Sequence, residues 1–123
     1  MRPNKIQQAW AEGRAAVNVF LCIPASFPAE IMASLDWDGI TIDMQHGVTD
    51  YHSMLHMMQG AARYEPAPMV RVPWNDPAII MKSLDAGAYG VICPMINTRE
   101  ECERFVGACR YAPAGYRSTG PVR

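Results

Sequence analysis

The sequence lacks the segments that would indicate a nucleotide-binding, zinc-binding or membrane protein. No glycine-rich phosphate loop, neither Gly-x-Gly-x-x-Gly nor the Walker type, follows any of its apolar runs. Its four cysteines form no Cys-x-x-Cys pair, so nothing supports zinc ligation. No apolar run approaches the roughly 20 residues that a membrane helix requires, and the polar residues 1–14 do not resemble a secretory signal.

Charge is also scarce. Eleven basic and twelve acidic residues leave a net charge of -1, which gives no reason to expect nucleic acid or an anionic membrane as a partner. Half of the 123 residues are hydrophobic, which is enough for one globular domain with a buried core. We expect a cytoplasmic protein with free, buried thiols at Cys22, Cys93, Cys102 and Cys109.

Four apolar runs predict strands, and a segment with helical features follows each of them. The expected strands are residues 17–23, 39–43, 68–72 and 90–93. The expected helices are residues 3–12, 28–35, 50–63, 98–110 and one that starts at an Asn75 or Asp76 cap and ends at Gly87. The apolar runs are continuous and do not alternate with polar residues, which is typical of a parallel sheet covered on both faces or closed into a barrel.

The order of these elements indicates a barrel. Four β-α units are half of a (β/α)₈ TIM barrel, which typically contains about 250 residues. Residues 115–123 have loop-like composition and no closing helix. We therefore expect residues 1–123 to be the N-terminal half of a single TIM-barrel domain, a fragment of about four βα units.

Polar side chains stand where two of the predicted strands end. His46 follows the second strand, and Arg71 ends the third among valines. Carboxyl ends of parallel strands meet at one edge of a sheet, where α/β enzymes place their chemistry. Histidine can act as a general base near neutrality. A guanidinium among apolar residues needs an anionic partner, either a substrate carboxylate or Asp43.

Other residues carry weaker signals. His52 and His56 are four residues apart on a methionine-rich helix, but no third metal ligand is evident, so we expect both to face solvent. Trp74 either walls a pocket or packs in the core. Asp43 and Gln45 are further candidates for the pocket wall.

Five ordered segments resemble one family. The chain is similar to the class II, metal-dependent pyruvate aldolases typified by 4-hydroxy-2-oxo-heptanedioate aldolase, within the aldolase/citrate lyase superfamily. The matching segments are I-D-M-Q-H at 42–46, V-R-V-P-W-N-D-P at 70–77, L-D-A-G-A at 84–88, V-I-C-P-M at 91–95 and R-Y-A-P-A-G-Y-R-S at 110–118.

The resemblance implies a carbon–carbon lyase that cleaves a 4-hydroxy-2-oxo acid to pyruvate and an aldehyde. Carried over residue by residue, His46 resembles the catalytic base, Arg71 the residue that stabilises the pyruvate enolate, and Asp85 the partner that raises the basicity of the histidine. A helix that follows a strand runs back toward the opposite end of the barrel, which would place Asp85 far from His46. The family also implies a divalent cation (Mg²⁺, Mn²⁺ or Co²⁺) and a homo-oligomer.

Two departures from the family pattern stand out. Met44-Gln45 replaces the Gly-Glu that usually precedes the histidine, which predicts a change in the pKa of the base or in aldehyde preference. The family's metal ligands, a Glu and an Asp, come from the second half of the barrel, so we expect no metal site in this chain and no activity of the fragment alone. Two alternatives remain open: a subunit of a lyase acting on a CoA thioester, and a non-catalytic half-barrel that binds or assembles.

Overall fold

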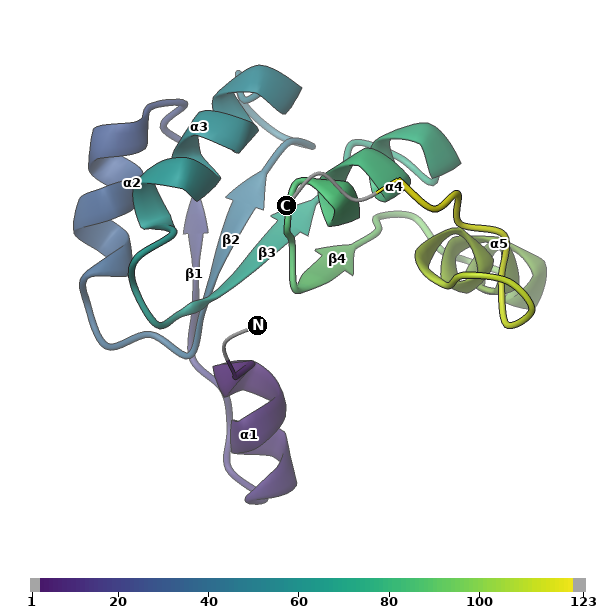
Figure 1. The fold of residues 1–123 in the computed structure, drawn as a ribbon, viewed down its shortest axis with the longest axis horizontal. Helices are drawn as coiled ribbons and strands as arrows, with labels where there is room; N and C mark the ends of the chain where they lie inside the picture. Colours follow the sequence, from purple (N-terminus) through teal and green to yellow (C-terminus); the bar gives the residue numbers. More distant parts are fainter. Residues whose placement is uncertain (1–2, 121–123) are drawn as a thin grey trace.

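The computed structural model describes residues 3–120, in which helices and strands alternate (Figure 1). The elements in chain order are α1 (Lys5–Ala11), β1 (Asn18–Leu21), α2 (Ser26–Ala33), β2 (Gly39–Asp43), α3 (Tyr51–Ala61), β3 (Ala67–Arg71), α4 (Pro77–Asp85), β4 (Gly90–Ile92) and α5 (Arg99–Cys109). No described helix is long and apolar enough to cross a membrane. The predicted sequence of elements is confirmed, with differences only in their bounds.

The four strands form one parallel sheet in the order β1-β2-β3-β4. Every residue of β2 is buried, as the continuous apolar run predicted. The core packs Ile40, Ile42 and Val70 from the strands against Met54 and Met57 of α3. The methionines are therefore core residues, and α2, α3 and α4 cover this face of the sheet.

The opposite face of the sheet carries a different set of side chains. Asn18 of β1 donates from Nδ2 to Oγ1 of Thr41 in β2, at 2.8 Å. Phe20 lies against the guanidinium of Arg71, 5.0 Å from ring centroid to Cζ. Because side chains alternate across a strand, the last residues of β2 and β3, Asp43 and Arg71, project on this second face as well.

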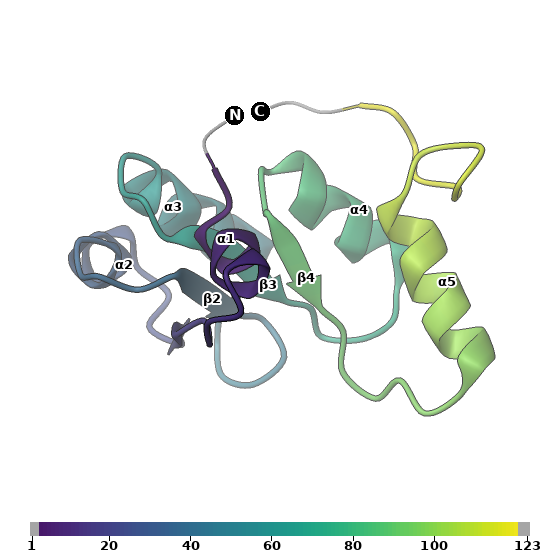
Figure 2. The same cartoon turned by 90° about the horizontal axis from the view of Figure 1, so that it is seen from below.

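Helix α1 lies apart from the other helices, at the amino ends of the strands (Figure 1), and the view from below shows it in front of the sheet (Figure 2). Its buried residues are Ile6 and Ala9. Ile6 occupies the space that a side chain at Gly39 would need, so α1 packs on the first residue of β2. The carboxyl ends of the strands are on the opposite side and are free of this helix.

Local side-chain caps explain where three helices begin. Asp50 accepts a hydrogen bond from the Ser53 amide at 2.8 Å at the start of α3, and Asp76 accepts one from the Ala78 amide at 2.9 Å at the start of α4. The Thr98–Glu101 capping box opens α5 as predicted. Each cap satisfies backbone amides that the first helical turn leaves unpaired.

The expectation of buried thiols is wrong for two cysteines. Cys22 is exposed because it lies just beyond β1, which ends at Leu21 and not at residue 23 as expected. Cys102 is exposed because it lies on the solvent side of α5, away from the buried Ala108. Cys93 and Cys109 are half-buried, and burial raises the pKa of both thiols.

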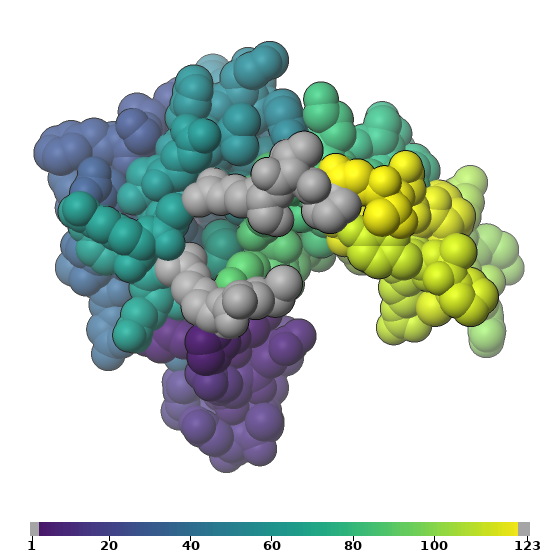
Figure 3. Space-filling model, in the orientation of Figure 1, coloured from purple at the N-terminus to yellow at the C-terminus, as the bar shows by residue number. Residues whose placement is uncertain are grey.

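Strands β1 and β4 are the outer strands of the sheet within residues 3–120. The surface is hollowed between α1 and α5, beside β4 (Figure 3). Unpaired strand edges are templates for pairing with another chain. We therefore expect this 123-residue chain to form dimers or larger assemblies, measured as a concentration-dependent sedimentation coefficient.

An edge-blocking substitution checks the cause. Ile92→Lys, at the end of β4, should reduce the association, whereas Val48→Lys, at a loop position that is 78% exposed, should not. A clean monomer over a wide concentration range would contradict the expectation.

Candidate active site

The strongest cluster of polar groups lies where β2 and β3 end. Asp43 and Arg71 are register partners on these neighbouring strands. Arg71 donates from Nε to Oδ1 of Asp43 at 2.8 Å and from Nη2 to Oδ2 at 2.5 Å. Of the two anionic partners considered for Arg71, the structure places Asp43 beside it, in a two-point ion pair.

This ion pair is largely removed from water. The Asp43 side chain is 2% exposed and that of Arg71 is 25% exposed. The hydrogen bonds from Arg71 hold the pKa of the Asp43 carboxyl below its ordinary value, and the backbone amides of Gln45 and His46 act in the same direction against the effect of burial. The same carboxylate raises the pKa of Arg71.

The turn that follows β2 is also attached to Asp43. Oδ1 accepts hydrogen bonds from the backbone amides of Gln45, at 3.0 Å, and His46, at 3.4 Å. Gly47 continues the turn with φ at 101°, a conformation that favours glycine. His46 is exposed, and its imidazole has no hydrogen-bond partner within the described part of the chain. The base candidate is thus placed through its backbone while its ring is free to meet a ligand.

Asp85 lies elsewhere. It is the last residue of α4, which connects two parallel strands and therefore ends beside the amino end of β4. Arg117 donates from Nη2 to Oδ1 of Asp85 at 2.7 Å and stacks on the ring of Tyr111 at 4.7 Å. Within one chain the structure does not bring Asp85 together with His46, as the direction of α4 predicted.

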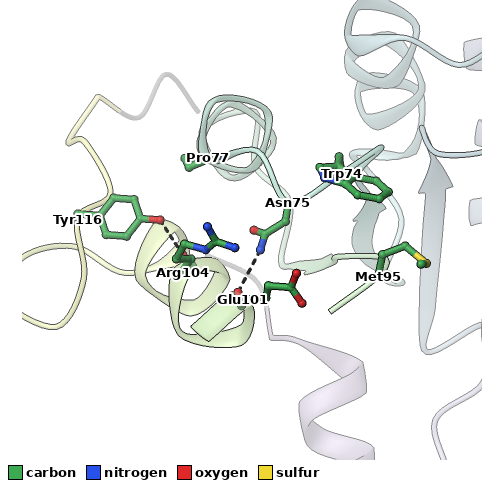
Figure 4. A pocket seen from close by; sticks show the side chains of 7 residues that line it. All are labelled: Trp74, Asn75, Pro77, Met95, Glu101, Arg104 and Tyr116. Carbon is green, nitrogen blue, oxygen red and sulfur yellow. Dashed lines mark hydrogen bonds between the residues drawn. The ribbon is translucent and has the colours of Figure 1, made fainter. Parts of the chain in front are cut away.

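Trp74 lines a pocket that is separate from the cluster at the strand ends. It is 59% exposed and faces Met95 across a pocket of about 350 Å³ between the start of α4 and helix α5 (Figure 4). Asn75 joins the two elements by donating to the Glu101 carbonyl oxygen at 3.0 Å. None of Asp43, His46 and Arg71 lines this pocket. The sequence offered Trp74 as a pocket residue together with Asp43 and Gln45, but the structure places Trp74 in a pocket whose other walls come from segments far apart in the chain.

The described residues do not offer a set of metal ligands. No group of three or more His, Cys, Asp and Glu side chains in residues 3–120 could hold a metal ion. The buried carboxylate at the strand ends is not available either, because both oxygens of Asp43 accept hydrogen bonds from Arg71. His52 and His56 are both exposed, as expected.

Comparison with known proteins identifies the class of protein that this fold and cluster define. The chain belongs to the HpcH/HpaI aldolase/citrate lyase family, whose model matches residues 18–122. This finding confirms the resemblance that the five sequence segments carry.

Individual relatives agree with this class. A hydroxypyruvate/pyruvate aldolase of Rhizorhabdus wittichii is 45% identical over 120 residues, which cover 98% of this chain and 48% of the relative. A 4-hydroxy-2-oxo-heptane-1,7-dioate aldolase of Salmonella dublin is 35% identical over 117 residues, 95% of this chain and 44% of the relative. The chain therefore spans about half the length of the curated relatives that it matches.

Solved structures confirm the fold. A family member from Burkholderia cenocepacia superposes with a TM-score of 0.87 at 26% identity, over 96% of this chain and 49% of that one. The fold is that of about half of a (β/α)₈ barrel, as predicted, and the Asp43–Arg71 cluster lies at the carboxyl ends of its strands.

The lowered pKa of Asp43 predicts acid sensitivity. Its ordinary value is 3.8, so the stabilisation from the ionised carboxylate is fully present above about pH 5 and is lost as the pH falls below 3.8 through the lowered pKa. Asp43→Asn should therefore flatten the dependence of the free energy of unfolding on pH in this range, measured by urea unfolding.

Salt provides the control for this measurement. A buried pair is screened little, so the difference between wild type and Asp43→Asn should persist at high ionic strength. Equal slopes for the two proteins would show that Asp43 binds protons equally in the folded and unfolded states, which would contradict a lowered pKa.

Proposed function

We propose that this chain supplies the enolate-stabilising half of a carbon–carbon lyase that cleaves a 4-hydroxy-2-oxo acid to pyruvate and an aldehyde. The observation that carries the proposal is Arg71, a partly buried guanidinium at the strand ends with one edge held by Asp43 and the other edge open. A fixed donor in this place suits an oxyanion that develops during reaction.

The proposed reaction is a retro-aldol cleavage. A base removes the proton of the C4 hydroxyl, the C3–C4 bond breaks to release the aldehyde, and the electron pair moves to the C2 oxygen to form the pyruvate enolate. Protonation at C3 then gives pyruvate. His46 is proposed as the base, and the open edge of Arg71 as the donor to the enolate oxygen.

The names of the relatives support this substrate class. They act on a 4-hydroxy-2-oxo acid and on pyruvate or hydroxypyruvate, which share the 2-oxo acid unit. A divalent cation, Mg²⁺, Mn²⁺ or Co²⁺, belongs to the proposal through the family and would polarise the 2-oxo acid. The described residues lack ligands for it, so the roles given to His46 and Arg71 do not depend on it.

Three further parts of the proposal rest on the family alone. They are the role of Asp85 in raising the basicity of the histidine, the homo-oligomeric state and the cytoplasmic location. Within the chain Asp85 is engaged by Arg117, so its proposed role requires an arrangement other than the one seen here.

The whole protein that carries this segment tests the function. Purified enzyme with Mg²⁺ and a 4-hydroxy-2-oxo acid should release pyruvate, measured by coupling to lactate dehydrogenase. Cleavage of a CoA thioester in place of the hydroxy-oxo acid would identify the alternative lyase. Absence of both activities would leave the non-catalytic half-barrel.

The 123-residue chain by itself should be inactive. The described residues contain no ligand set for the cation that the proposed reaction uses, and half of the relatives' length lies outside the match. Pyruvate release by the purified fragment that depends on added Mg²⁺ or Mn²⁺ would contradict this prediction.

Substitution of the two strand-end residues should separate their effects in the whole protein. His46→Ala should lower kcat by roughly 10²–10⁴-fold, the usual contribution of a positioned proton-transfer group. Arg71→Ala should cost on the order of 3–4 kcal/mol in the chemical step, as the loss of one oxyanion donor does. Both are measured by steady-state kinetics.

Two controls accompany these variants. Arg71→Lys should rescue little, because one nitrogen cannot serve both oxygens of Asp43 and an oxyanion. Arg99→Ala removes an exposed cation that pairs with Glu103 and should leave kcat unchanged. A folded Arg71→Ala enzyme with wild-type kinetics would mean that Arg71 is structural.

A further inference from the structure

We propose that Asp43 is a positioning residue that holds the guanidinium of Arg71 and the turn bearing His46 in one fixed arrangement. The inference rests on the proposed function where it concerns catalysis. Its structural part, that one carboxylate positions both the guanidinium and the turn, rests on the observed contacts alone.

The two oxygens of Asp43 connect the ends of three strands. Oδ1 accepts from Nε of Arg71, at the end of β3, and from the amides of Gln45 and His46, in the turn after β2. Oδ2 accepts from Nη2 of Arg71, and the Sγ of Cys22, just after β1, lies 4.0 Å from it. A displacement of this carboxylate therefore moves the base and the cation together.

The contacts also select which edge of the guanidinium faces a ligand. The edge formed by Nε and Nη2 is used by Asp43, and the guanidinium carbon lies over the ring of Phe20. Within the described residues Nη1 has no acceptor, so the edge with Nη1 is the one presented. Because Asp43 compensates the positive charge of Arg71, the guanidinium acts mainly as a hydrogen-bond donor of fixed direction.

The same strand carries a matched pair at its other end. Asp38, just before β2, accepts hydrogen bonds from Nη1 and Nη2 of Arg14, both at 3.0 Å, and from the amide of Val17 at 2.8 Å. The Asp38 side chain is 9% exposed. It resembles Asp43 in burial, in its two-point arginine partner and in its backbone donors, but lies at the amino end of β2, away from the candidate site.

This pair provides the control for a kinetic test in the whole protein. Asp43→Asn and Asp38→Asn should both lower the urea midpoint of unfolding, since each removes an ion pair from a buried carboxylate. Only Asp43→Asn should lower kcat, by about 10²-fold, because reacting groups are misplaced. The exchange of pyruvate C3 protons for deuterium should fall with it, while the KM for the oxo acid changes less.

Two more variants define the mechanism. Asp43→Asn should cost little further activity in an Arg71→Ala background if Asp43 acts through Arg71. Asp43→Glu keeps the charge but moves it by one methylene group, so it should fold and still show a lower kcat. Wild-type kcat in either folded Asp43 variant would overturn the catalytic part of the inference.

Hydrogen exchange tests the structural part of the inference and needs no measurement of enzyme activity. In wild type, the amide hydrogens of Gln45 and His46 and the Nε hydrogen of Arg71 should exchange slowly, observed by ¹⁵N NMR. All three should lose protection together in Asp43→Asn, or in Asp43→Glu if the former does not fold, and keep it in Asp38→Asn. Independent behaviour of the turn and the guanidinium would overturn the inference.

The two measurements separate the possible failures. If the wild-type protein releases no pyruvate, the proposed function fails, and the exchange data alone support or overturn the coupling of Arg71 to the turn. If pyruvate is released and Asp43→Asn matches Asp38→Asn in kcat, the function stands and the positioning role fails.

Discussion

The buried carboxylate of Asp43 is the constraint on which the candidate site depends. It lies at the end of a strand whose five residues are all buried, and its side chain is 2% exposed. An ionised carboxylate in such a place is costly unless charge and hydrogen bonds compensate it. Arg71 and two backbone amides provide that compensation, so satisfying the carboxylate also determines where the arginine and the turn lie.

Strand β2 shows how a buried parallel strand ends without unpaired charge. Asp38 and Asp43 flank its apolar residues, and each is paired with an arginine from a neighbouring segment. The arginines come from different parts of the chain, before β1 and at the end of β3. The two pairs therefore link β2 to both of its neighbours, in addition to the backbone ladder.

Much of this arrangement could be predicted from the sequence. Continuous apolar runs predicted the parallel sheet, and the cap residues Asp76 and Thr98 predicted two helix starts, because both signals are local. The position of Arg71 at a strand end predicted an anionic partner, either a substrate carboxylate or Asp43. The register of β2 and β3 places Asp43 beside it. The register depends on contacts between strands, which a single sequence does not reveal.

Other features could not be predicted, for the same reason. The exposure of Cys22 depends on β1 ending at Leu21, and the pocket walled by Trp74 and Met95 depends on how α5 packs against the start of α4. The tie between Asp43 and the amides of Gln45 and His46 spans only two and three residues, a spacing common in aspartate turns. This turn is the exception, because its signal is local and stands in the sequence at residues 43–46.

The distribution of charge in this half of the barrel has a chemical consequence. In the described residues the carboxylates at the ends of β2 are each neutralised by an arginine, and no carboxylate or imidazole cluster could hold a cation. The groups left available at the strand ends are the open edge of the Arg71 guanidinium and the exposed imidazole ring of His46. Such a surface can receive negative charge that develops on an oxygen, but it offers no anionic oxygen atoms to a metal. Under the proposed function, the chemistry is divided between two halves of one barrel, with the oxyanion donor and base on the strands described here and the cation-binding carboxylates expected on the others.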